Sequence, residues 1–113
     1  MKLPYFRKAH VPKRKLTAYL LDPQHESAKG KASYFIDRGF RAGDWSVFAE
    51  ALREHAALHD VTETETDEYG TIYVIEGPLQ IPGGTYTERS VRSVWMIPTA
   101  QDAPRFITAY PLS

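Results

Sequence analysis

The spacing of apolar residues changes near residue 60, and this change constrains the fold more than any other feature of the sequence. Before it, apolar residues recur every three or four positions, as in helices that bury one face. After it, short segments alternate in polarity or are rich in β-branched residues, as in strands. Helices followed by strands predict an α+β fold in which the helices pack on one face of an antiparallel sheet.

Three helices are predicted in the first half, and each is bounded by a proline, a glycine or a capping residue: 11–22, 27–38 and 44–58. Pro12 is tolerated in the first turn of the first helix. Ser27 and Asp44 are predicted N-caps of the second and third, because their side chains can accept hydrogen bonds from free N–H groups. Gly39 occupies the C-cap position of the second helix.

Four strands are predicted in the second half: 61–66, 71–76, 90–97 and 105–110. The first alternates threonine with glutamate, which is typical of an edge strand. Short turns rich in glycine separate the strands, at 68–70 and 82–84. We therefore predict a single domain over residues 1–113, with three N-terminal helices on one face of a four-stranded antiparallel meander.

Length and composition exclude several classes of protein. A chain of 113 residues with 42% hydrophobic and 25% charged residues is typical of one globular domain. The absence of cysteine excludes disulfides, thiolate metal sites and cysteine nucleophiles. The basic N-terminus is not followed by an apolar segment, and no apolar run approaches the length of a membrane span. We expect a cytoplasmic protein with no membrane partner.

The charge of the chain is balanced overall but divided unevenly along it. Residues 1–41 contain ten basic and three acidic side chains, and residues 42–113 contain four basic and eleven acidic ones, which gives formal charges of +7 and −7. An anionic partner such as RNA is one explanation of a strongly basic half. The other explanation is that the two halves attract each other in the fold, and charge alone does not separate the two.

A histidine and two lysines surround the predicted start of the second helix, in the stretch QHESAKGKA (24–32). The first turn of a helix presents free N–H groups and a partial positive charge. This pattern therefore predicts a phosphate site at the helix start, formed by His25, Lys29 and Lys31, where the imidazole would supply an acid–base group. The alternative is a basic helix end that is only solvated.

Polar side chains also occur along the last predicted strand. Alternation predicts two faces, one with Phe106, Thr108 and Tyr110 and the other with Arg105, Ile107 and Ala109. Arg105 and Thr108 share a site only if the loop turns Arg105 at the start of the strand. Otherwise Thr108 and Tyr110 pack in the core, and only their hydroxyl groups reach a partner.

Arg89 and Arg92 precede Val94 and Trp95 of the third predicted strand. Arg92 alternates with the tryptophan, so it is predicted on the open face of the sheet if the helices cover the Trp95 face. Arginines on an open sheet face can bind the phosphates of nucleic acid, and Lys29, Arg89 and Arg92 are our predicted nucleic-acid contacts. An ordinary solvated sheet surface is the alternative.

His55 and His59 are four residues apart, a spacing that can bind zinc on one face of a helix. They also extend the apolar stripe of the third helix, and the glutamate that follows the first histidine in metalloprotease helices is missing. We interpret them as structural histidines, and we predict neither a metal nor a cofactor.

Six segments together resemble an uncharacterised prokaryotic domain family, found as stand-alone proteins and as the last domain of polymorphic toxins: KLTAYLLDPQH, KGKASYFIDRGF, DWSVFAEALREHA, EYGTIYVIEGPL, SVWMI and PRFITAYP. The pattern of that family has a histidine six residues before a lysine-alanine pair, and His25 and Lys31-Ala32 match it. The chain departs from the pattern at Glu26 and Ala28, where the family usually has proline and glycine.

The resemblance implies the ribonuclease fold shared by barnase, EndoU, colicin nucleases and RelE, and with it metal-independent cleavage of RNA. In that reading His25 is the base or acid, Lys31 and Arg105 stabilise the charge on the phosphate, and Thr108 and Tyr110 position it. A cognate neutralising protein is then also expected. The alternative is a non-catalytic interaction domain, such as the immunity or accessory partner in such a pair.

Overall fold

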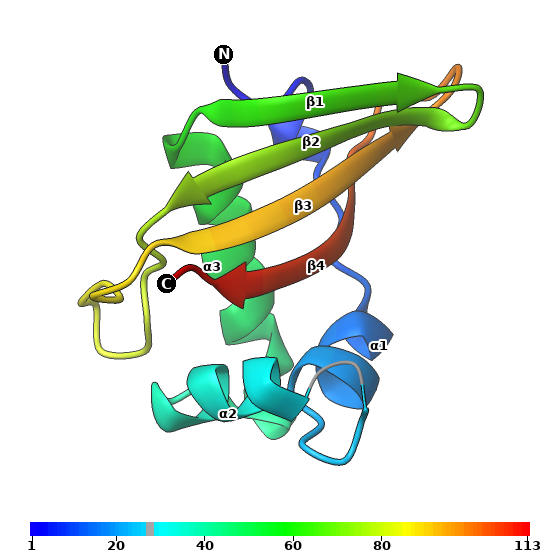
Figure 1. The fold of residues 1–113 in the computed structure, drawn as a ribbon. Helices are drawn as coiled ribbons and strands as arrows, with labels where there is room; N and C mark the ends of the chain where they lie inside the picture. Colours follow the sequence, from blue (N-terminus) through cyan, green and yellow to red (C-terminus); the bar gives the residue numbers. More distant parts are fainter. Residues whose placement is uncertain (27–28) are drawn as a thin grey trace.

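The computed structural model describes residues 1–26 and 29–113, and in it helical segments precede a four-stranded sheet (Figure 1). The helical segments are η1 (Phe6–Lys8), α1 (Lys13–Lys15), η2 (Leu16–Leu20), α2 (Lys29–Asp37), η3 (Ala42–Asp44) and α3 (Trp45–Leu58). The strands are β1 (Val61–Asp67), β2 (Gly70–Gly77), β3 (Val91–Pro98) and β4 (Arg105–Pro111). The predicted α+β class and order of elements are confirmed.

The predicted helix ends are partly confirmed. α2 ends at Asp37, and Gly39 stops it as predicted: Gly39 has a φ of +104° and lets the Phe40 N–H reach back to the Phe35 carbonyl at 3.2 Å. α3 follows Asp44, but the Asp44 side chain makes no capping hydrogen bond. The predicted N-cap at Ser27 lies outside the described residues.

The sheet is an antiparallel meander in the order β1-β2-β3-β4, as predicted. β1 forms one edge, and from Thr62 to Asp67 its side chains are exposed, which agrees with its polar composition. β4 forms the other edge of the sheet. The two edges differ in their neighbours, because α2 and α1 contact β4.

The helices do not all lie on one face of the sheet. α3 runs behind the sheet and contacts β2 and β3, whereas α1 and α2 lie beyond the β4 edge (Figure 1). The prediction that three helices pack on one face is therefore not confirmed. The hydrophobic core continues past β4, where Leu16, Leu20 and Phe35 are fully buried, and this burial holds the first two helical segments there.

Aromatic side chains join these layers. Trp95 of β3 and Phe106 of β4 are buried with ring centroids 5.4 Å apart, and Phe40 stacks on Phe48 of α3 at 4.3 Å. Phe35 of α2 lies 4.9 Å from Phe48, which connects α2 to α3. Close-packed aromatic contacts of this kind set α2 at a defined position beside β4.

β4 contains a bulge at Ile107. Trp95 pairs with Phe106 while the preceding Val94 pairs with Thr108, so Ile107 is an extra residue in the ladder. Phe106 faces the core, whereas Thr108 lies on the opposite, open face of the sheet with Val94. The predicted sharing of one face by Phe106 and Thr108 is therefore wrong, because strict alternation assumes that no residue is inserted.

Replacing Gly70 with alanine is expected to lower the free energy of unfolding by about 3 kcal/mol. Gly70 has a φ of +151°, and a β-carbon there would lie 2.3 Å from the backbone oxygen of Ile97. Gly43→Ala is the matched control, since a β-carbon at Gly43 meets no atom within 4 Å. Urea denaturation compares the two variants, and equal stability of both would contradict the prediction.

Candidate functional site

A cleft of about 490 Å³ lies between the first helical segments and the start of β4. Its lining comprises Pro12, Arg14, Lys15, Ala18, Tyr19, His25 and Arg105. Three of these side chains are cationic, one is an imidazole, and no carboxylate is among them. The cleft therefore brings together two of the predicted site residues, His25 and Arg105.

A hydrogen-bonded group of three side chains, Tyr19, Lys31 and Thr108, adjoins this cleft. The Lys31 ammonium of α2 donates to the Tyr19 hydroxyl of η2 at 2.8 Å and to the Thr108 hydroxyl of β4 at 3.3 Å. The two hydroxyl oxygens are 3.1 Å apart, so they also share a hydrogen bond. All three side chains are half-buried. Three elements thus meet at one ammonium group, and Lys31 and Thr108 are two of the predicted site residues.

Tyr110 also lies close to Lys31. The Lys31 ammonium is 5.5 Å from the centroid of the Tyr110 ring, and the Tyr110 hydroxyl accepts a hydrogen bond from Arg92 at 3.1 Å. Arg92 in turn donates to the Glu76 carboxylate at 2.8 Å. Tyr110 therefore connects the predicted site residue Lys31 to an ion pair on the open face of the sheet.

Two lysines change the acidity of Tyr19. Burial by itself raises the pKa of the Tyr19 hydroxyl, but it is outweighed by the hydrogen bonds with Lys31 and Thr108 and by the positive charges of Lys31 and Lys15. The pKa of Tyr19 therefore lies below its usual value of 10.0. Lys15 is held in place because its ammonium also donates to the Ile107 carbonyl at 3.1 Å.

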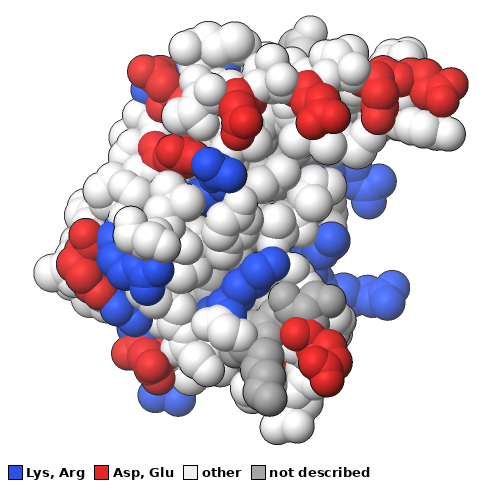
Figure 2. All heavy atoms as spheres, in the orientation of Figure 1, with Lys and Arg blue, Asp and Glu red and all other residues white. Residues whose placement is uncertain are grey.

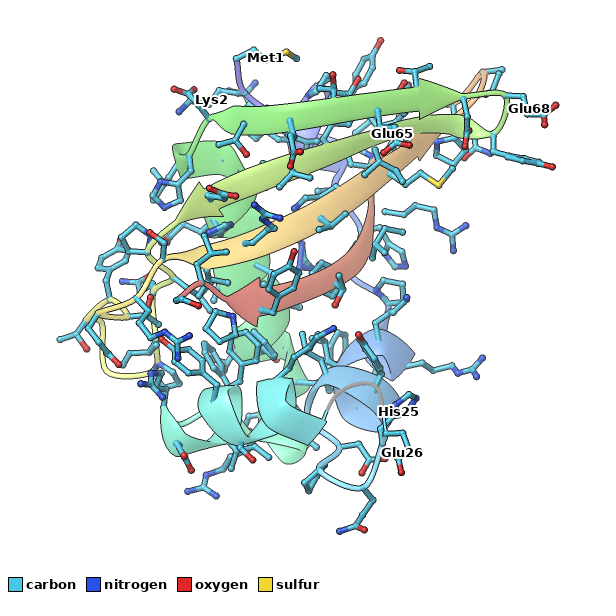
Figure 3. All side chains as sticks on the ribbon, viewed as in Figure 1. Met1, Lys2, His25, Glu26, Glu65 and Glu68 are labelled. Carbon is cyan, nitrogen blue, oxygen red and sulfur yellow. The ribbon has the colours of Figure 1, made fainter. Side chains whose placement is uncertain are left out.

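His25 lies in the loop between η2 and α2, with the exposed Glu26 beside it (Figure 3). The turn is local: the Gln24 N–H donates to the Asp22 carboxylate at 2.9 Å, and the His25 N–H donates to the Asp22 carbonyl at 3.1 Å. The imidazole meets the Tyr19 ring edge-to-face with centroids 5.0 Å apart. This contact directs the predicted acid–base residue toward the cleft.

The bulge in β4 resolves the difficulty that the sequence posed for Arg105 and Thr108. Arg105 pairs with Met96, Thr108 with Val94 and Tyr110 with Arg92, and these partners alternate with the buried residues of β3. All three polar side chains of β4 therefore share the open face of the sheet. One inserted residue brings them together, whereas regular alternation would separate Arg105 from the other two.

The predicted nucleic-acid contacts do not gather at the cleft. The Arg89 guanidinium donates to the Leu112 carbonyl at 2.7 Å, and Arg92 is paired with Glu76. Neither side chain lines the cleft. The side chain of Lys29 lies outside the described part of the structure, so only its backbone position at the start of α2 is known.

His55 is a structural histidine, as interpreted from the sequence. Its Nε2–H donates to the carbonyls of Gly77 and Val91 at 3.0 and 2.9 Å, and its Nδ1 is 2.9 Å from the Ser93 hydroxyl, which also accepts the Trp95 indole N–H. Carbonyl groups only accept, so the proton is on Nε2 and Nδ1 accepts from Ser93. Among the described residues, no group of three or more His, Asp or Glu could hold a metal ion.

Tyr19 is the residue that our sequence-based site lacks. Its spacing with Leu16 and Leu20 predicts a position in an apolar helical stripe, and the two leucines are fully buried. The useful signal is that a tyrosine on such a stripe carries a hydroxyl that needs a polar partner. Arg14 and Lys15 were also missed, although they stand in the basic run that precedes the stripe.

The division of charge along the chain is only partly a division in space. Acidic side chains follow the β1 edge, with Glu65 and Glu68 at the side of the molecule away from His25 (Figures 2 and 3). Lys2, Lys8 and Arg38 of the basic half form ion pairs with acidic residues of the other half. No ion pair within the described ranges involves the cleft cations Arg14, Lys15 and Arg105, so attraction between the two halves accounts for only part of the basic half.

No helix formed by residues 1–26 or 29–113 is long and apolar enough to cross a membrane.

Comparison with known proteins identifies a similar fold and a sequence family. A chain in the structure of a contact-dependent growth inhibition toxin–immunity protein complex from Klebsiella pneumoniae 342 is similar in fold, with a TM-score of 0.68 and 18% sequence identity. The similarity covers 96% of this chain and 97% of that one. No curated protein matches the chain. A sequence model described as a domain of unknown function, DUF6883, matches residues 2–113, and the chain therefore belongs to the DUF6883 family.

Proposed function

We propose that the chain is a metal-independent ribonuclease of the toxin type, which cleaves RNA phosphodiester bonds. One observation carries the proposal: a single cleft is lined by His25, Tyr19 and three cations that form no ion pair among the described residues. Positive groups concentrated in a concave site favour an anionic ligand. A phosphodiester supplies that charge, and the imidazole supplies acid–base chemistry.

The proposed reaction uses the 2′-hydroxyl of RNA as an internal nucleophile. His25, in its neutral form, takes the proton of the 2′-hydroxyl, and the resulting oxygen attacks the adjacent phosphorus. The bond from phosphorus to the 5′-oxygen breaks, which leaves a 2′,3′-cyclic phosphate and, after protonation, a 5′-hydroxyl. Lys31 and Arg105 stabilise the negative charge that develops on the phosphate oxygens, and the hydroxyls of Thr108 and Tyr110 position the group.

We infer that the chain acts within a toxin system and has a cognate neutralising protein. The resemblance to toxin C-terminal domains supports this, and so does the fold shared with a chain of the Klebsiella complex. A protein that covers a cationic cleft must bring negative charge, because it would otherwise bury unpaired cations. RNA is the proposed substrate, so the cytoplasm is the proposed site of action.

The second candidate function is a non-catalytic interaction domain, such as an immunity or accessory protein. The observation that favours it is the saturation of several polar groups by intramolecular partners. Lys31 joins η2, α2 and β4 through two hydroxyls, and Arg92 is held by Glu76 and Tyr110. In this second candidate function these bonded groups hold the helices to the sheet and do not act on a substrate.

Induced expression in bacteria tests the proposal. We expect the wild-type chain to arrest growth and to fragment total RNA into pieces with 2′,3′-cyclic phosphate ends. The His25→Ala/Arg105→Ala variant, which removes an imidazole and a cation from the cleft, is expected to do neither. Arg7→Ala/His10→Ala is the matched control, because both residues are exposed and neither lines the cleft. Normal growth with intact RNA, from folded wild-type protein, would favour the second candidate function instead.

A further inference from the structure

We propose that Tyr19 is the catalytic acid of this site, which protonates the 5′-oxygen as it leaves, and that Lys31 is the residue that positions it. This inference rests on the proposed function and deepens it, because it specifies the linkage: a phosphodiester whose poor alkoxide leaving group needs a proton. Cleavage of such a bond requires one group to remove the 2′ proton and a second to supply a proton to the 5′-oxygen.

The position of Tyr19 suits the second group. Tyr19 and His25 line the same cleft, and their rings meet edge-to-face at 5.0 Å. The Tyr19 ring is also close to two ammonium groups, those of Lys31 at 5.3 Å and Lys15 at 5.6 Å from its centroid. A phosphate bound between these cations would have an imidazole and a phenol within the same cavity, so that one group can accept a proton and the other can donate one.

The hydrogen bonds among Tyr19, Lys31 and Thr108 leave one hydroxyl proton available for a ligand. Lys31 carries only donors, so both hydroxyl oxygens, of Tyr19 and Thr108, accept from it. The two hydroxyls have two protons between them, and their mutual hydrogen bond at 3.1 Å uses one. When Thr108 donates in that bond, Tyr19 keeps its proton available for a further acceptor. The leaving oxygen of a bound phosphodiester is an acceptor of the required kind.

The charges around Tyr19 favour the product of proton transfer. The hydrogen bonds and charges of Lys31 and Lys15 hold the Tyr19 pKa below its usual value, which makes the phenol a stronger acid than free tyrosine. In the proposed step the Tyr19 proton passes to the 5′-oxygen as the bond from phosphorus breaks. The phenolate that remains is stabilised by the Lys31 ammonium. After cleavage, His25 still carries the proton that it took from the 2′-hydroxyl. Transfer of this proton through water to the Tyr19 phenolate restores both groups, so protons balance over one turnover.

Tyr19→Phe removes the proton and keeps the ring, so it tests the assignment directly. Two substrates are compared. The oxygen substrate is an oligoribonucleotide that the wild-type protein cleaves, and the sulfur substrate is the same oligonucleotide with sulfur in place of the 5′-oxygen at the cleaved linkage. A thiolate leaves without protonation. We expect Tyr19→Phe to slow cleavage of the oxygen substrate roughly 100- to 1,000-fold and that of the sulfur substrate less than about tenfold. Tyr69→Phe, at an exposed turn, is the matched control.

Each other outcome overturns the inference in a different way. Equal slowing of both substrates would mean that Tyr19 binds the phosphate without donating a proton. An unchanged rate with the oxygen substrate would mean that Tyr19 has no role in catalysis. If wild-type protein cleaves neither substrate, the proposed function fails and this inference fails with it.

The pH profile of cleavage provides a second test that does not depend on Tyr19→Phe. An acid must be protonated, so the wild-type rate is expected to fall at alkaline pH as Tyr19 ionises. Lys31→Met removes the neighbouring charge, which should raise the Tyr19 pKa and move this alkaline decline to higher pH. A decline at the same pH in both proteins would contradict the positioning role of Lys31.

Discussion

Acidification from about pH 7 to about pH 4 is expected to remove about 3 kcal/mol from the free energy of unfolding, because His55 is buried in its neutral form. Burial lowers the pKa of His55 from 6.5 to about 4; the neighbouring His59 also lowers it, and hydrogen bonds to the Gly77 and Val91 carbonyls partly oppose the shift. Only 2% of the residue is exposed. A charged imidazole there would have to give up the hydrogen bond that its Nδ1 accepts from Ser93.

The sign follows from proton binding in the two states. Between about pH 6.5 and pH 4 the unfolded chain binds a proton at His55 that the folded chain does not. The contribution of His55 to stability is therefore present above the unfolded pKa and is lost as the pH falls toward the folded pKa. Below about pH 4 both states are protonated and the contribution no longer changes.

Urea denaturation at successive pH values measures this contribution. The His55→Gln variant is expected to be less stable at neutral pH but to lose much less stability than wild type on acidification. His10→Gln, at an exposed histidine, should follow the wild-type curve. The carboxylates are the same in all three proteins, so differences between the curves isolate His55. A wild-type ring that titrates near pH 6.5 by NMR would contradict the prediction, even if the variant does not fold.

Lys31→Met is expected to reduce RNA cleavage by roughly 100- to 1,000-fold, which is the usual effect of losing one preorganised group that stabilises transition-state charge. Methionine keeps most of the apolar stem of lysine, so the change removes the ammonium with little change in packing. The Tyr19 and Thr108 hydroxyls can still bond each other at 3.1 Å after the change. We therefore expect stability to change by less than about 1 kcal/mol.

The purified variant should be compared with Lys8→Met under single-turnover conditions. Lys8 is an exposed lysine that pairs with Asp102, and exposed pairs contribute little to stability. It lies outside the cleft, so Lys8→Met is expected to cleave RNA at the wild-type rate. Full activity of Lys31→Met would remove Lys31 from the site. A large loss of both stability and activity would instead favour the second candidate function, in which Lys31 holds α2 to β4.

The elements of this fold were predictable because their signals are local. The change of period near residue 60, the glycine at the end of α2 and the Thr-Glu alternation of β1 each follow from the conformation of a few adjacent residues. The order of strands was predictable too, since short turns join antiparallel neighbours. The cluster of basic residues in the first half was visible directly in the sequence.

The candidate site was predictable only in part. His25, Lys31, Arg105, Thr108 and Tyr110 could be named from the sequence, but strict alternation put Arg105 and Thr108 on opposite faces of β4. The bulge at Ile107 was not visible, because an inserted residue depends on how β3 and β4 pack rather than on the composition of either strand. Tyr19 was missed because an amphipathic stripe does not reveal whether a hydroxyl reaches solvent or a partner.

The sequence by itself therefore determined the secondary structure, the family and the residue types available for phosphate chemistry. Only the tertiary structure decided which of these residues meet. Lys31 and Thr108 are 77 residues apart in the chain, and Tyr19 and Thr108 are 89 apart, yet their polar atoms lie within hydrogen-bonding distance. Such contacts form because apolar burial holds η2 and α2 beside β4, and that packing depends on the whole core rather than on any local pattern of residues.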